Sequence, residues 1–78
     1  MAYISKLHRG EQGRQRAQAE AIEGEFLPLN FDGEKFIQIN TFGSAGRKER
    51  GKESQNIRLG REAFEQLVKL GSEHFKGQ

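Results

Sequence analysis

The dipeptide Asp32-Gly33 is the sequence feature that most limits how this chain can fold. It separates two strand-like runs, GEFLPLNF before it and EKFIQINTF after it. Asp-Gly between such runs favours a two-residue hairpin turn, in which both turn residues adopt positive φ angles. A two-residue turn also fixes the register of the two strands. The predicted cross-strand pairs are Leu29 with Phe36, Pro28 with Ile37, and Phe26 with Ile39.

Neither face of this predicted hairpin is purely polar. Alternation places Phe26, Pro28, Ile37 and Ile39 on one face. It places Leu27, Leu29, Phe36, Gln38, Asn40 and Phe42 on the other. An antiparallel pair with one solvated side normally has one polar face. We therefore expect that protein covers both faces or that one face receives a ligand. Pro28 lacks an N–H group, which favours an edge strand or a bulge.

The C-terminal third predicts a strand followed by a helix. Ile57 and Leu59 alternate with polar residues in a short strand over 55–59, and Gly60 ends it. From Arg61 to about Phe75 the spacing is helical, with an apolar stripe of Phe64, Leu67, Val68 and Phe75. We expect Phe64, Leu67 and Val68 to cover the sheet. The fold class is then α+β, an antiparallel sheet of three to four strands with a C-terminal α-helix on one face.

The chain divides into an arm and one small domain. Residues 1–23 are polar and rich in glutamine and alanine, and they predict a flexible N-terminal arm, with a short strand at Ala2–Leu7 or a short helix as its structured alternatives. Residues 24–76 form the predicted domain. A 78-residue chain without cysteine has little core and no disulfide to compensate. We therefore expect a homodimer, with Leu67, Leu70 and Phe75 at the interface.

Composition argues against several classes of protein. The chain has no cysteine, which excludes a thiolate zinc site. It has only two histidines, His8 and His74, so we expect no other metal cluster. The motifs of nucleotide hydrolases, zinc proteases and serine hydrolases are missing, so we expect no enzyme, no cofactor and no small-molecule substrate. No apolar run resembles a membrane span or a signal peptide. We expect no membrane partner and a cytoplasmic protein, nucleoid-associated if the source is prokaryotic.

The strongest functional signal is a basic, glycine-containing loop over residues 43–54. From Arg47 to Arg61 six basic residues stand against two acidic ones, a balance of +4 that exceeds the +2 of the whole chain. Flexible basic side chains suit phosphate oxygens, and glycines allow close approach of the backbone. The alternative is a solvated loop whose charge serves only solubility. The predicted phosphate contacts in this loop are Arg47, Lys48, Arg50 and Lys52.

A second signal lies on the predicted strand before this loop. Phe36 and Phe42 share a face with Gln38 and Asn40. Single-stranded bases stack on aromatic rings, and amides can bond to base edges. The alternative is that both phenylalanines fill the core or a dimer interface. Lys35 and Arg58 would extend the positive rim.

The order of motifs resembles a known family. KFIQINTFGS, the loop ending in RGKES, and QNIRLGREAFEQLVKL resemble the single-stranded-DNA-binding transcriptional coactivator family (positive cofactor four) and its small prokaryotic and phage relatives. Gly51-Lys52, Ile57-x-Leu59 and Glu62-x-Phe64-x-x-Leu67 match in order, within residues 24–70. Three extra residues, 53–55, and Gly60 at the helix start depart from the family pattern. The resemblance implies a curved four-stranded antiparallel sheet and dimerisation through the helices.

The resemblance also implies a grooved basic sheet that binds single-stranded or melted DNA with little sequence preference. By position, the phosphate contacts would be Lys35, Arg47, Lys48, Arg50, Lys52 and Arg58, and the stacking residues Phe36 and Phe42. Our leading hypothesis is a homodimeric single-stranded DNA or RNA binding protein, without catalytic activity, in transcription regulation or in replication and repair. The alternative is a protein-interaction accessory module that binds no nucleic acid and uses the doubly apolar hairpin for a partner protein.

Overall fold

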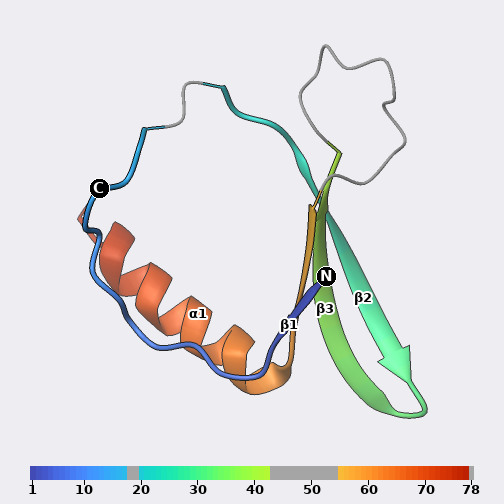
Figure 1. The fold of residues 1–78 in the computed structure, drawn as a ribbon. Helices are drawn as coiled ribbons and strands as arrows, with labels where there is room; N and C mark the ends of the chain where they lie inside the picture. Colours follow the sequence, from blue (N-terminus) through green and yellow to red (C-terminus); the bar gives the residue numbers. More distant parts are fainter. Residues whose placement is uncertain (18–19, 43–54, 78) are drawn as a thin grey trace.

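The computed structural model describes residues 1–17, 20–42 and 55–77, and it shows an α+β fold (Figure 1). The described elements are four strands and one helix. In chain order they are β1 (Ala2–Ile4), β2 (Gly24–Phe31), β3 (Glu34–Thr41), β4 (Gln55–Leu59) and α1 (Arg61–Phe75). The strand over 55–59 and the C-terminal helix lie where the sequence predicts them. The strand that the sequence offers as one alternative at Ala2–Leu7 is present and shorter, over Ala2–Ile4.

The β2–β3 hairpin has the register that the Asp-Gly turn predicts. Leu29 pairs with Phe36, Pro28 with Ile37, and Phe26 with Ile39. Asp32 and Gly33 have φ angles of 52° and 90°, so both turn residues adopt positive φ. The side-chain Oδ1 of Asn30 accepts a hydrogen bond from the Gly33 N–H at 2.9 Å. This local bond further fixes the turn, and through it the faces of both strands.

The sheet is mixed, which corrects the expectation of a purely antiparallel sheet. Its strand order is β1-β4-β3-β2, and β1 runs parallel to β4, with Ala2 beside Ile57 and Ile4 beside Leu59. The Gly60 N–H continues this contact by donating to the Ile4 carbonyl at 3.2 Å. Because the two strands are parallel, the arm after β1 and the helix after β4 leave the same end of the sheet, and they run side by side (Figure 1). Pro28 lies on the edge strand β2, as expected.

The helix does not cover the sheet, contrary to the sequence-based expectation. Phe64, Leu67 and Val68 are 42%, 47% and 49% exposed. Gly60 alone links β4 to α1, and from this short link the helix diverges from the sheet (Figure 1). Only the junction is well packed, with Leu59 and Ala63 buried.

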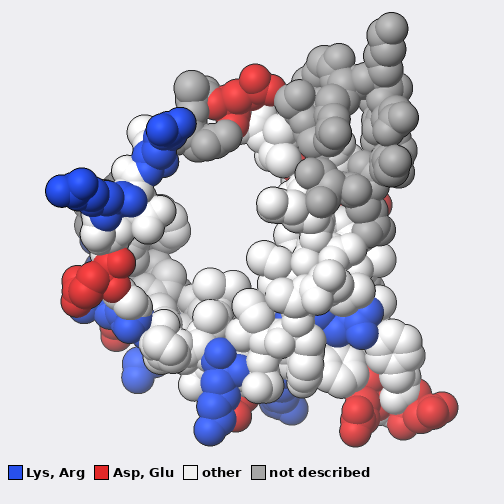
Figure 2. Space-filling view, viewed as in Figure 1, with Lys and Arg blue, Asp and Glu red and all other residues white. Residues whose placement is uncertain are grey.

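The space-filling view shows an opening between α1 and the sheet (Figure 2). Uncharged side chains form most of its border, and the charged side chains in view lie mainly on the outer surface. Phe64 lines a pocket together with Ile37 and Leu59 of the sheet. Over the described ranges, no helix is long and apolar enough to cross a membrane.

Candidate nucleic-acid interface

The strand register gathers the candidate site on one face of the sheet, which we call the amide face. Its members alternate with the residues of the opposite face and come from all four strands. They are Tyr3 on β1, Glu25, Leu27, Leu29 and Phe31 on β2, Glu34, Phe36, Gln38 and Asn40 on β3, and Asn56 and Arg58 on β4. The opposite face, called the aliphatic face, carries Phe26, Pro28, Ile37, Ile39, Ile57 and Leu59.

A hydrogen-bond network occupies the middle of the amide face. Gln38 Nε2 donates to Asn40 Oδ1 at 2.9 Å, and the Gln38 Oε1 accepts from Arg58 Nε at 3.1 Å and from Arg58 Nη2 at 2.9 Å. Asn40 Nδ2 donates to Glu25 Oε1 at 3.4 Å. Gln38 and Asn40 are only 7% and 2% exposed. Their amides therefore serve the fold and orient Arg58, which differs from the expectation that they bond to base edges.

Three aromatic rings lie beside this network and form what we call the aromatic cluster, Tyr3, Phe31 and Phe36. The ring of Tyr3 meets Phe36 edge-on, with centroids 5.7 Å apart and an interplanar angle of 81°. Phe31 lies 6.1 Å from Phe36 at 50°. The Arg58 guanidinium carbon stands 5.3 Å from the centroid of the Phe31 ring, within the range of a cation–π contact. Gln38 and Phe31 thus hold Arg58 from two sides.

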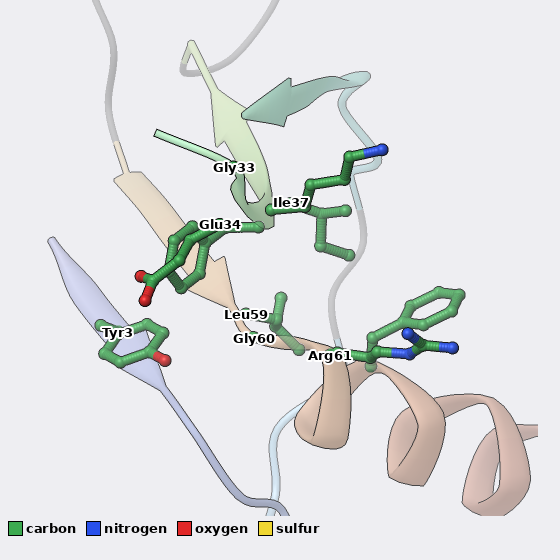
Figure 3. A pocket seen from close by; sticks show the side chains of 10 residues that line it. Tyr3, Gly33, Glu34, Ile37, Leu59, Gly60 and Arg61 are labelled. Atoms are coloured by element: carbon green, nitrogen blue, oxygen red, sulfur yellow. The ribbon is translucent and has the colours of Figure 1, made fainter. Parts of the chain in front are cut away.

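A pocket opens at the end of the sheet where β4 meets α1 (Figure 3). Figure 3 shows Tyr3 and Glu34 on one side of it and Ile37, Leu59 and Arg61 on the other. The pocket is lined by Tyr3, Gly33, Glu34, Lys35, Phe36, Ile37, Leu59, Gly60, Arg61 and Phe64. Its charged rim is mixed, because Glu34 offsets Lys35, and Arg61 Nε pairs with Glu65 Oε2 at 3.3 Å.

The structure brings together two of the predicted nucleic-acid contacts. Phe36 and Arg58 share the amide face. Lys35 belongs to the aliphatic face by register, and it lines the same pocket as Phe36. Phe42 follows β3 and is half-buried; six residues of extended chain place it roughly 20 Å from Phe36, at the other end of the face. The other four, Arg47, Lys48, Arg50 and Lys52, lie outside the described residues.

The three predicted interface residues occupy different positions on α1. Leu67 and Phe75 are 47% and 64% exposed, on the apolar stripe. Leu70 is half-buried. It lies one turn after Gln66, whose Oε1 accepts a hydrogen bond from the Leu7 N–H at 2.6 Å, so it belongs to the side of the helix along which the arm runs. Leu67 and Phe75 are therefore accessible to a partner, and Leu70 is less so.

Sequence reasoning missed two members of the aromatic cluster. Phe31 could have been found, because the hairpin register that assigns Phe36 to the amide face assigns Phe31 to the same face through its pairing with Glu34. Tyr3 could not have been found in this way. Its place depends on a parallel pairing with Arg58, and no turn between the two strands fixes that register.

No protein-family model matches the chain, and comparisons with curated proteins and with solved structures find no similar protein. The resemblance to the coactivator family therefore stays a prediction. In the described part of the chain, no group of three or more histidine, aspartate or glutamate side chains is placed to hold a metal ion. Among the described residues, the candidate site consists of aromatic rings and Arg58.

Proposed function

We propose that this protein is a homodimeric single-stranded nucleic-acid binding protein with little sequence specificity. It acts without catalysis, in transcription regulation or in replication and repair. Bases of the bound strand stack on the amide face, and basic side chains at its margin contact the phosphates. The proposal rests on the character of this face and on the charge of the segment between β3 and β4.

The observation that carries the proposal is the exposed aromatic cluster beside Arg58. Tyr3 and Phe31 are 58% and 50% exposed, although large rings on a small protein are normally buried. Base–aromatic stacking contributes about 1–3 kcal/mol per base and tolerates any sequence, because every base has a π-face. The amides of Gln38 and Asn40 are buried and bonded to each other, so they do not read base edges, which agrees with low specificity.

The charge of the 43–54 segment supports the same function. The segment connects β3 to β4, and its two ends are adjacent, since Thr41 pairs with Gln55. The sequence between these two ends contains four basic residues, and Phe42 directly precedes it. A strand that stacks on the aromatic cluster and continues along β3 toward Phe42 would bring its phosphates to this end. Neutralisation of phosphates by lysine and arginine supplies most of the affinity in non-specific binding.

The experiment is a fluorescence-anisotropy titration of a labelled oligo-dT. The test variant replaces Arg47, Lys48, Arg50 and Lys52 by alanine, and we expect a dissociation constant about ten-fold or more higher than that of the wild type. The matched control removes four charges from exposed positions on the arm and helix, namely Arg14, Arg16, Lys69 and Lys76. Equal weakening in both variants would show that net charge, and not this site, binds the strand.

A protein-interaction module is the second candidate, and exposed apolar surface favours it. Phe26 and Ile57 on the aliphatic face are 59% and 43% exposed, and the helix stripe is comparably exposed. Surfaces of this kind mark contacts with protein. The homodimer uses them within the leading proposal, whereas an accessory module would use them for another protein. No affinity for any oligonucleotide, together with a retained protein partner in the four-alanine variant, would favour the module.

A further inference from the structure

We infer that the pocket beside Gly60 is a base-binding site and that β1 is part of it through Tyr3. This inference rests on the proposed function and adds a location to it. The N-terminal segment is then a contributor to the binding surface and not only a tether. The bound group is a nucleobase of a single strand, held against the rings of Tyr3 and Phe36.

Gly60 creates the space for this site. Its backbone is extended, with φ −80° and ψ 176°, so the chain conformation does not require glycine. A Cβ atom at this position would lie 3.1 Å from the hydroxyl oxygen of Tyr3, so glycine allows the Tyr3 ring to lie close to the backbone here. Gly60 follows β4, which lies between β1 and β3, and it has no side chain. The Tyr3 and Phe36 rings meet across this gap.

The rings are held in place yet accessible. The Gly60 N–H anchors β1 by its bond to the Ile4 carbonyl, and pairing with Arg58 sets the register of Tyr3. Phe36 is half-buried between its edge-on contact with Tyr3 and its contact with Phe31. Tyr3 itself remains 58% exposed. A fixed ring with an open surface is suited to stacking, because little side-chain freedom is lost on binding.

The charges around the pocket are of both signs, so an uncharged ring can enter it. Glu34 lines the pocket on the side of Tyr3, and its carboxylate would repel a phosphate. Of the two cations at the pocket rim, Arg61 is paired with Glu65. Lys35 has no ion pair among the described residues. A base placed between the rings and Glu34 can offer its amino or imino N–H groups to the carboxylate, and its phosphates can remain outside the pocket.

The chain offers a direct probe, since Tyr3 is its one tyrosine and tryptophan is absent. Intrinsic tyrosine fluorescence therefore reports on this residue alone. We expect oligo-dT to quench the fluorescence of the wild-type protein, after correction with N-acetyltyrosinamide for light absorbed by the oligonucleotide. An abasic oligonucleotide of equal length, which has the same phosphates, should bind more weakly and leave the fluorescence unchanged. Binding of oligo-dT without quenching, or equal quenching by both strands, would overturn the inference.

Variants give a second readout by anisotropy. Tyr3→Leu should weaken oligo-dT binding about five-fold or more, since one stacking contact is lost, whereas Tyr3→Phe should bind as the wild type does. The control Ile22→Ala truncates an exposed apolar side chain of the arm, outside the pocket and the predicted dimer interface, and should leave affinity unchanged. Wild-type affinity in Tyr3→Leu would overturn the inference alone, whereas no binding of any oligonucleotide by the wild type would overturn the proposed function. If Tyr3→Leu does not fold, the inference is tested by the fluorescence of the wild-type protein with oligo-dT and with the abasic oligonucleotide.

Discussion

At the scale of single residues, Gln38 connects the fold to the candidate site. One side chain links three strands, because it lies on β3, accepts twice from Arg58 on β4 and donates to Asn40, which in turn bonds to Glu25 on β2. Arg58 is thereby held over Phe31 and not left mobile. A buried amide that bonds to its neighbours is structural, and its loss costs the network those hydrogen bonds.

Gln38→Met keeps the length of the side chain and removes its polar atoms. We expect it to lower the free energy of unfolding by about 1–3 kcal/mol, since it removes the hydrogen bonds that Gln38 makes with Asn40 and with Arg58 on the amide face. Urea unfolding at fixed protein concentration measures the change. The matched control is Gln55→Met, because Gln55 is exposed on the neighbouring strand, and its effect should be close to zero. Equal stability of the two variants would contradict a structural role for Gln38.

At the scale of elements, the hairpin turn sets the faces of the sheet. Gly33 has a φ of 90° and open space around its Cα. Backbone strain at positive φ, and not contact with neighbouring atoms, therefore limits which residues can replace it. We expect Gly33→Ala to destabilise the protein by about 1–2 kcal/mol. Gly10→Ala serves as the control, because Gly10 has an ordinary φ and equally open surroundings, and it should be neutral or slightly stabilising. Thermal unfolding compares the two, and equal midpoints would contradict the turn assignment.

The sequence predicts those elements whose cause is local. Asp32-Gly33 determines the hairpin register, Ile57 and Leu59 mark β4, and the apolar spacing after Gly60 marks α1. The direction of β1 escapes prediction, because its pairing with β4 joins segments more than fifty residues apart. The same holds for Tyr3 in the candidate site. The position of the helix away from the sheet could not be predicted either. An apolar stripe indicates that something covers the helix, and it does not indicate which surface does so.

At the scale of the whole molecule, the described part of the single chain leaves apolar surface unburied on two elements. The aliphatic face and the stripe of α1 both carry side chains that are more than a third exposed. A chain of 78 residues with few buried apolar side chains is marginally stable by itself. A second copy that covers these surfaces would supply the missing burial, and dilution below the dimer dissociation constant should then unfold the protein.

Leu67→Lys tests this expectation on the helix stripe. We expect a shift from dimer to monomer in size-exclusion chromatography with light scattering, and a lower unfolding midpoint, because burial of a leucine contributes about 1.5–3 kcal/mol. Glu73→Lys introduces the same residue outside the stripe and should leave the dimer intact. A monomeric wild type that stays folded on dilution would contradict the predicted homodimer and leave the exposed stripe for another partner.

The central claim, single-stranded nucleic-acid binding, is tested most directly by anisotropy titrations of one oligonucleotide as a single strand and as a duplex over a series of salt concentrations. The proposed interface predicts tighter binding of the single strand, because stacked bases in a duplex cannot reach Tyr3 and Phe36. It also predicts that the logarithm of the binding constant falls linearly with the logarithm of salt concentration, with a slope of about −0.7 per phosphate neutralised. Equal or tighter binding of the duplex, or affinity that does not change with salt, would contradict it.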